Sequence, residues 1–385
     1  MALFRLILKN TFRQKLRAFL TIAGIAIAIL GFSFLRTVIS GWYGGVEASS
    51  QNRLITRNAI SLAFPLPLAY KGVLQGIPGV TGVSYGDWFG GVYIDEKNFF
   101  PQFAIDAPTY FDLYPEFKVP PEQMQAFLRE RNAAIVGVKL ATRYGWKIGD
   151  TVRLRGTFFP SDWDFVIRGI YKGAEPTTDE TQFFFHWQYV EERERQNDSP
   201  MAGHVGWYVL RVSNPELAGP VSQAIDQRFK NSLAATLTES EKAFQMGFVS
   251  MTESILIALK IVSFLIIGVI LVVLSNTMAM TVRERLKEFS VLKAMGFRPR
   301  HLMTLIAGES LLIALLGGGL GIAVTAPAVA VFAKKLENFF PLLRVETATY
   351  LACLLTAVGV AFGAAIFPIW RAITLKIADG LRRIG

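Results

Sequence analysis

Four long apolar segments constrain the fold of this chain more than any other feature. They cover residues 18–38, 251–280, 303–333 and 347–370. A helix needs about 20 predominantly apolar residues to cross the hydrocarbon core of a bilayer, and each segment reaches that length. We therefore expect an α-helical membrane protein with four transmembrane helices.

Basic residues cluster at the ends of these segments, in residues 1–17, 281–302 and 371–385. Together these stretches hold fifteen Lys and Arg against three acidic residues, while the whole chain carries a net charge of +10. Short loops rich in Lys and Arg stay in the cytoplasm, so both termini and residues 281–302 are expected there. This placement indicates contact with anionic membrane lipids and argues against nucleic acid as a partner.

The first 17 residues have helical periodicity, with basic side chains four apart at Arg5, Lys9, Arg13 and Arg17. They predict an amphipathic helix on the cytoplasmic membrane surface, although the same charges also suit the plain start of a membrane anchor. The apolar segment that follows is longer than the core of a usual secretion signal. No small-residue cleavage site comes after it, so we expect an uncleaved span.

Residues 40–250 have a different pattern, in which short runs of alternating apolar and polar residues are separated by turns. Strands are expected within residues 79–95, 149–156 and 164–171, and helices within residues 120–132, 136–145 and 215–232. These elements predict an α+β periplasmic domain, inserted between the first and second spans and large enough for its own core. Residues 177–195 place aromatic side chains beside charges. We interpret them as a strand and a helix of the fold, with a substrate or partner surface as the alternative.

From Leu237 the pattern is helical again, and no proline occurs before Gly296. We expect one continuous helix to leave the outer domain and become the second span. Such a helix would link the two sides of the membrane rigidly. The remaining connections are a cytoplasmic coupling segment, a short periplasmic loop and a cytoplasmic tail, at residues 281–302, 334–346 and 371–385.

Small residues four apart allow helices to approach closely in lipid. We expect four glycines of the third and fourth spans to lie in helix contacts: Gly317, Gly321, Gly359 and Gly363. The alternative is that they are simply tolerated in a span. Glu309 lies two turns into the third span, where an unpaired acid is costly. We expect it to be paired near the cytoplasmic interface, with a proton- or substrate-handling role as the alternative.

Motifs that would make the chain an enzyme are absent. It contains no G-x-x-x-x-G-K-[ST] phosphate loop, no H-E-x-x-H zinc motif and no G-x-S-x-G nucleophile elbow. The three histidines are scattered and the single cysteine, Cys353, lies in an apolar run, so we expect no metal site and no internal disulfide. We therefore predict no catalytic residue and no cofactor in this chain.

Three stretches resemble the FtsX/MacB-type permeases, the membrane subunits of type VII (mechanotransmission) ABC transporters. They are RERLKEFSVLKAMGFRPRHL at residues 283–302, GESLLIALLGGGLG at 308–321 and PIWRAITLKIADGLR at 368–382. The last departs from the family pattern, which often has proline where this chain has Ile377-Ala378. GWKIGDTVRL and DFVIRGIY are similar to strands of the family's periplasmic core domain, and the order of the spans agrees over the whole chain.

The resemblance implies a multi-pass protein of the bacterial cytoplasmic (inner) membrane. Its coupling helix would dock in a groove of a separate ATPase subunit, which would bind the ATP and Mg. The residues that the resemblance assigns to this coupling are Arg283, Glu284, Lys287, Glu288, Val291, Leu292, Lys293, Ala294, Met295 and Gly296. Glu284, Lys287 and Glu288 would pair with the ATPase, whereas Val291, Leu292 and Met295 would supply an apolar anchor.

The resemblance also implies a second permease copy or a paralogue, and some members of the family work with a periplasmic adaptor or lipoprotein. Members of the family export or extract lipids, lipoproteins or small molecules, and this is the function we expect. The alternative is an FtsX-like regulator that transmits force to a periplasmic enzyme without transport. A sensor or scaffold without an ATPase would need an output domain, and an intramembrane hydrolase would need a paired nucleophile and base, so we disfavour both.

Overall fold

The computed structural model describes residues 2–336 and 343–374, with side chains for residues 5–333 and 343–374. Within these residues the chain forms two compact units. The helical unit comprises residues 2–41, 252–335 and 343–374, and the sheet domain comprises residues 42–251. The predicted periplasmic loop and C-terminal tail lie partly outside the described residues.

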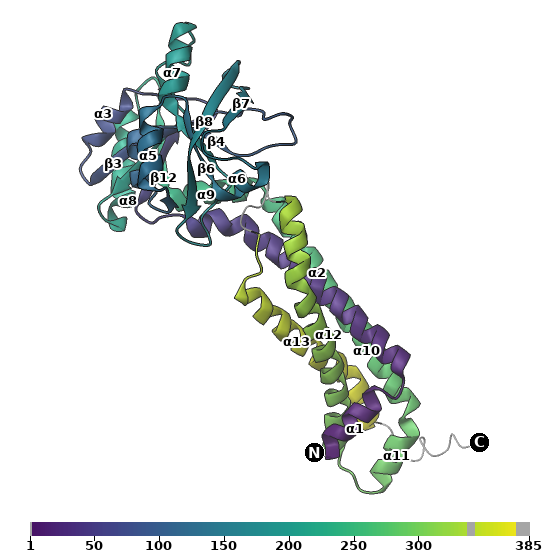
Figure 1. Ribbon diagram of the computed structural model, residues 1–385. Helices are drawn as coiled ribbons and strands as arrows, with labels where there is room; N and C mark the ends of the chain where they lie inside the picture. Colours follow the sequence, from purple (N-terminus) through teal and green to yellow (C-terminus); the bar gives the residue numbers. More distant parts are fainter. Residues whose placement is uncertain (1, 337–342, 375–385) are drawn as a thin grey trace. The chain divides into compact units, whose positions relative to one another are not determined.

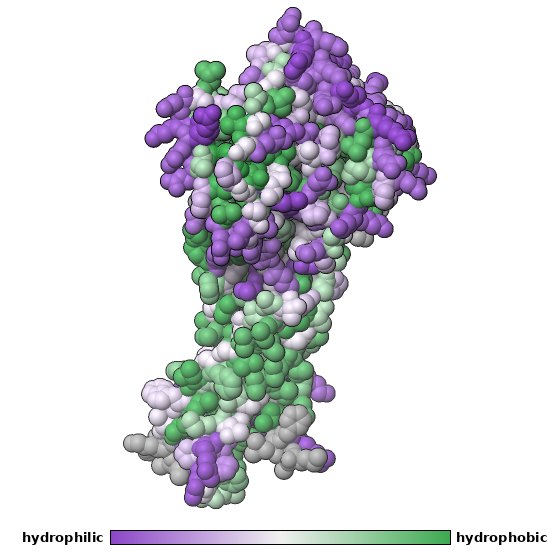
Figure 2. Space-filling view, turned by 90° about the vertical axis from the view of Figure 1, so that its left-hand side faces the viewer, coloured by the Kyte–Doolittle hydropathy of each residue, from purple (hydrophilic) through white to green (hydrophobic). Residues whose placement is uncertain are grey.

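Four helices of the described chain are long and apolar enough to cross a membrane: α2 (Lys15–Ala48), α10 (Glu253–Glu284), α12 (Pro299–Leu336) and α13 (Thr347–Thr374). They run side by side, and two shorter helices, α1 (Ala2–Thr11) and α11 (Leu286–Ala294), lie at one end of them (Figure 1). Buried apolar residues such as Ile25, Leu274 and Ala361 fill the space between the long helices. Figure 2 shows that the helices expose mainly hydrophobic residues, as expected of a surface that faces lipid.

The N-terminal helix is shorter than the sequence predicts. We expected one helix over residues 1–17, but α1 ends at Thr11 and α2 begins at Lys15. The hydroxyl of Thr11 donates a hydrogen bond to the carbonyl of Ile7 at 2.9 Å.

The sheet domain is built on a mixed sheet. Its strand order is β12-β1-β11-β3-β4-β9-β6-β8-β5, with β7 paired to β8. The bounds of these strands are β1 (Arg53–Asn58), β3 (Val80–Trp88), β4 (Gln102–Ile105), β5 (Phe117–Lys118), β6 (Ala133–Gly137), β7 (Thr151–Arg155), β8 (Asp162–Gly173), β9 (Phe183–His186), β11 (Trp207–Val212) and β12 (Thr236–Ser240). A separate two-stranded sheet pairs β2 (Leu66–Pro67) with β10 (His204–Val205).

Helices cover both faces of the main sheet. One face packs against α3 (Tyr70–Gln75), α6 (Val138–Tyr144), α7 (Trp187–Gln196) and α8 (Ala218–Phe229). A short 3-10 helix, η1 (Pro215–Leu217), precedes α8. The other face packs against α4 (Ala107–Leu113), α5 (Pro121–Arg129) and α9 (Glu241–Met251). The α+β domain predicted between the first and second spans is therefore present.

The aromatic segment at residues 177–195 contains β9, a central strand of the sheet, and most of α7. Phe183 and Phe185 enter the core on one face of the sheet, and Phe184 enters the core on the other. All three rings are fully buried, because helices cover both faces of the sheet at this strand. A strand covered on both faces is expected to be apolar at every position rather than at alternate ones. The strand and the helix expected in this segment are therefore present, and these three phenylalanines belong to the core rather than to a substrate or partner surface.

The continuous helix predicted from Leu237 into the second span is also wrong. Residues 236–240 form β12, which pairs with β1, and α9 follows. A break at Thr252, with φ −107° and ψ 11°, then separates α9 from α10. Pairing with a strand about 180 residues earlier overrides the local helical pattern. The residues expected to form one helix are thus a strand and two helices, β12, α9 and α10.

Asp87 on β3 predicts a pH dependence for the sheet domain. Burial raises the pKa of this carboxyl to about 7, an effect that the hydrogen bond from the Trp88 N–H partly offsets. The folded domain therefore holds this proton more tightly than the unfolded chain. As the pH rises from about 4 to about 7 the unfolded chain loses the proton first, so the free energy of unfolding falls, by at most about 1.4 kcal/mol per pH unit.

The measurement is thermal unfolding of the protein at a series of pH values in this interval. The Asp87→Asn variant keeps an acceptor oxygen for Trp88 but has no proton to exchange, and its unfolding should depend less on pH. An equal pH dependence of the two proteins would contradict this assignment.

Candidate coupling site

The predicted coupling residues lie on the end of α10, on α11 and on the turn that follows. α10 ends at Glu284, Arg285 connects it to α11, and α11 ends at Ala294. Gly296 has φ +88°, a left-handed conformation that glycine adopts without strain. The N–H groups of Gly296 and Phe297 donate to the carbonyls of Lys293 and Leu292, both at 3.0 Å, and these bonds close the end of α11.

The inner face of α11 packs on the membrane helices. Phe289 is buried against Leu302 and Ile306 of α12, with Ala372 of α13 in the same cluster. The ammonium group of Lys293 donates to the carbonyl of Ile373 at 2.8 Å. Sequence reasoning did not single out Phe289, although its spacing with Leu286 and Leu292 was the signal that could have identified an apolar helix face. These contacts seat α11 firmly on α12 and α13.

The two acids predicted to pair with the ATPase have partners within this chain. Glu284 accepts both terminal nitrogens of Arg17, at 2.6 and 3.0 Å, and the Gln14 amide at 2.8 Å. Glu288 accepts Arg13 at 2.5 Å and Arg285 at 2.8 Å. The turn between α1 and α2 brings the N-terminal donors to the coupling segment, a proximity that sequence spacing does not reveal.

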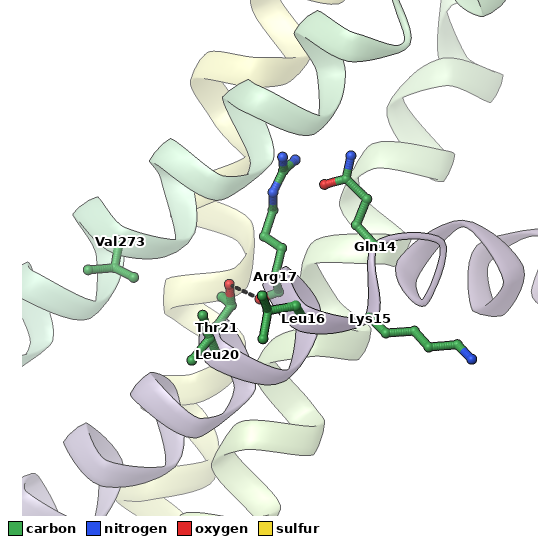
Figure 3. A pocket seen from close by; sticks show the side chains of 7 residues that line it. All are labelled: Gln14, Lys15, Leu16, Arg17, Leu20, Thr21 and Val273. Carbon is green, nitrogen blue, oxygen red and sulfur yellow. Dashed lines mark hydrogen bonds between the residues drawn. The ribbon is translucent and has the colours of Figure 1, made fainter.

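Gln14 and Arg17 extend in the same direction from the start of α2, whereas Lys15 points away from them (Figure 3). This common direction explains how both side chains reach Glu284. Leu16, Leu20 and Val273 line the same open groove, which has a volume of about 570 Å³ between α2 and α10. The hydroxyl of Thr21 donates to the carbonyl of Arg17 at 2.9 Å, so this donor is satisfied within α2.

Glu309 of α12 is paired with Arg285, whose terminal nitrogen lies 2.6 Å from the carboxylate. Glu309 is only 3% exposed, and Arg285 is also buried. Burial opposes the charged guanidinium, but hydrogen bonds and charge from Glu288 and Glu309 outweigh it and raise the pKa of Arg285. The pairing accounts for an acid at this position without a proton- or substrate-handling role.

A polar cavity of about 180 Å³ adjoins this pair, between α1, α2, α10 and α12. Its lining includes the charged residues Arg13, Arg17, Glu284, Arg285 and Glu309. Three arginines and two glutamates thus surround it, and Arg17 and Arg285 are bonded to Glu284 and Glu309, as expected of an interlocked structural network. Among the described residues, no group of three or more His, Cys, Asp or Glu side chains could hold a metal ion.

The outer face of α11 is open. Lys287, Val291 and Ala294 are exposed and lie on one side of the helix, at spacings of four and three residues. Val291 is 46% exposed and Met295, which follows them, is 62% exposed. The ten predicted coupling residues therefore divide into an inner group, which holds α11 in place, and an outer group, which another protein can reach.

Two of the four predicted packing glycines lie directly against α2. A Cβ atom on Gly317 would come within 2.7 Å of the Cβ of Ile25, and one on Gly321 within 2.7 Å of the carbonyl of Ala26. Gly363 faces Leu271 of α10 at 3.1 Å. Gly359 differs from the expectation, because no atom from another helix among the described residues lies within 4 Å of its Cβ position.

Comparison with known protein families decides the identity of the chain. The MacB-like periplasmic core domain matches residues 18–228, and the FtsX-like permease C-terminal domain matches residues 260–377. The chain belongs to the FtsX/MacB-type ABC transporter permeases. The permease match thus contains the coupling segment, α12 and α13, whereas the core-domain match contains most of α2 and the sheet domain as far as the last turn of α8.

Relatives of this permease agree with the assignment. It is 24% identical over 340 residues to an uncharacterized ABC transporter permease of Methanocaldococcus jannaschii, covering 82% of this chain and 80% of that one. It is 32% identical over 132 residues to the macrolide export ATP-binding/permease protein MacB 2 of Yersinia pestis bv. Antiqua (strain Antiqua), covering 34% of this chain but only 19% of that protein. Among solved structures, the extracellular domain of the ABC-type transporter YknZ from Gram-positive bacteria aligns with 49% of the permease and 99% of that domain, at 13% identity and a TM-score of 0.36.

Proposed function

We propose that this permease couples ATP hydrolysis by a separate ATPase subunit to movement of its sheet domain, for export or extraction of a lipid, a lipoprotein or a small molecule. The ATPase subunit would bind the ATP and Mg. The observation that carries the proposal is the two-sided packing of α11. Its inner face is seated on α12 and α13 through Phe289, while its outer face exposes Lys287, Val291, Ala294 and Met295.

A helix with one face packed on the membrane helices and the other face exposed can receive force from a bound protein and transmit it to those helices. The apolar side chains of Val291 and Met295 provide contact area for a groove on the ATPase, and Lys287 provides a charge at its edge. Because Arg13 and Arg17 hold Glu288 and Glu284, a displacement of α11 would also reach α2. The ATPase would therefore move the first span together with the second and third.

The distribution of basic residues supports one membrane orientation. With the basic residues near α1 and α11 in the cytoplasm, the sheet domain would lie on the opposite side of the cytoplasmic membrane. A second permease copy or a paralogue would cover α10. Only 17% of the most apolar window of α10 is buried within the chain, against 39% for each of the other three spans. A periplasmic adaptor or lipoprotein would complete the assembly in the transport-active case.

The Ala294→Asp substitution tests the docking face. We expect it to raise the Kd for the ATPase subunit at least tenfold, or about 1.4 kcal/mol, because an unpaired carboxylate would be buried in an apolar contact. Binding is measured with the full-length permease in nanodiscs. Glu288→Gln is the control, since its partners lie within the chain, and it should change the Kd less than about twofold. Unchanged association after residues 283–297 are scrambled would rule out coupling through this segment.

One reconstitution assay distinguishes transport of a substrate from force transmission without transport. If the permease moves a substrate, proteoliposomes that contain it and its ATPase should translocate labelled lipid or lipopeptide in an ATP-dependent manner. An FtsX-like regulator would instead stimulate a periplasmic hydrolase under the same conditions and translocate nothing.

A further inference from the structure

Residues 42–251 of the sheet domain continue into the membrane helices at both ends, and these two connections meet within the domain. Residues 49–52 lead from α2 into β1, and α9 leads from β12 toward α10. β1 and β12 are neighbours in the sheet, with Leu54 opposite Ser240. The start of the first strand and the end of the last strand therefore lie side by side.

A buried arginine occupies this point. Arg53 is 4% exposed, and its Nε donates to the carboxylate of Glu241, the first residue of α9, at 2.9 Å. The same oxygen of Glu241 accepts the backbone N–H of Ser50 at 2.8 Å. One carboxylate thus holds both connections, and Arg53 holds that carboxylate.

The other side of the guanidinium reaches the segment that follows α4. The two terminal nitrogens of Arg53 donate to Glu116 at 2.5 and 3.0 Å, and one of them also donates to the carbonyl of Leu113 at 2.8 Å. The guanidinium lies 4.1 Å from the centre of the Tyr114 ring. Arg53 therefore joins three separate parts of the domain: β1, α9 and the end of α4 with the segment after it. A lysine has a single ammonium group and cannot make these bonds in the same planar geometry.

Stability alone does not require such a group. A buried ion pair contributes little more than apolar residues of similar volume, because both charges lose their hydration, but it defines the geometry of its surroundings. Burial opposes the charge of Arg53, yet the bonds to Glu116 and the charge of Glu241 keep its pKa above the ordinary value. The guanidinium is therefore charged at any pH at which the domain is folded.

We propose that Arg53, Glu116 and Glu241 form a clamp that makes the two membrane connections move as one and passes their displacement to the segment after α4. Only the source of the displacement rests on the proposed function. The clamp itself is a property of the sheet domain. It replaces the rigid rod that the sequence predicted, because a break at Thr252 leaves α9 joined to the domain rather than continuous with α10. Arg53 is a positioning residue in this scheme.

Pulsed electron paramagnetic resonance tests the clamp in the full-length permease in nanodiscs. Cys353→Ala removes the native thiol, and spin labels at Glu47→Cys and Met246→Cys, both exposed sites, report the distance between the connections. We expect one narrow distance distribution in the parent and a distribution at least twice as wide in Arg53→Lys. Glu239→Gln is the matched control, because it removes the ion pair of 3.2 Å between Arg57 and Glu239 on the same two strands, and it should leave the distribution narrow. Equal widths in all three proteins would overturn the proposal.

A second variant covers the case in which Arg53→Lys does not fold. Glu116→Gln weakens only the far arm of the clamp. The distance between positions 47 and 246 should then stay narrow, while that between Glu47→Cys and an added label at Pro115→Cys, an exposed site after α4, widens. With the ATPase subunit bound, ATP and vanadate should leave the 47–246 distance unchanged. A shift would overturn the claim that the connections move together. If no ATPase binds, the proposed function fails but the nucleotide-free distances still test the clamp.

Discussion

Arg285→Leu is expected to lower the free energy of unfolding of the helical unit by about 3–5 kcal/mol. The substitution leaves the carboxylate of Glu309 buried and without its partner at 2.6 Å. It also removes one of the two arginines that hold Glu288. Removal of one member of a buried ion pair is costly because the remaining charge has lost its hydration and gains nothing in return.

Denaturation with increasing SDS in mixed micelles measures this loss. The double variant Arg285→Leu/Glu309→Leu removes both charges and should recover most of the stability, since an apolar pair of similar volume is tolerated. Arg13→Leu is the matched control: its ion pair with Glu288 is largely exposed and should contribute less than about 1 kcal/mol. A double variant as unstable as Arg285→Leu would show that the pair is not the source of the effect.

Gly317→Val should cost about 3 kcal/mol or prevent accumulation of folded protein. The added Cβ would lie 2.7 Å from the Cβ of Ile25 and 2.9 Å from the carbonyl of Ile22, and a backbone atom cannot move aside without displacing α2. The same denaturation experiment measures the loss. Gly319→Val, two residues further along α12, places its Cβ in open space and should change the stability by no more than about 0.5 kcal/mol. Equal effects at the two positions would indicate a helix-propensity effect rather than close packing.

The candidate site was predictable as a segment but not as a set of contacts. Residues 281–302 stand out because a short basic stretch between two apolar runs is visible in any window of the sequence. The sequence assigns Glu284 and Glu288 to the ATPase, whereas the structure pairs them with Arg17 and Arg13, more than 260 residues earlier in the chain. Periodicity also predicts a helix where β12 pairs with β1, because a short helix and a strand on a sheet edge use similar residues.

By itself the sequence determined the four apolar helices, the folded domain between the first two, and the short basic segment between the second and third. These depend on length, hydropathy and charge, which are local properties of the chain. Only the tertiary structure decided which charges are available to a partner and how the sheet domain is joined to the membrane. Arg53 meets Glu241 across 188 residues, and such a meeting depends on the packing of the whole sheet domain rather than on any neighbouring residue.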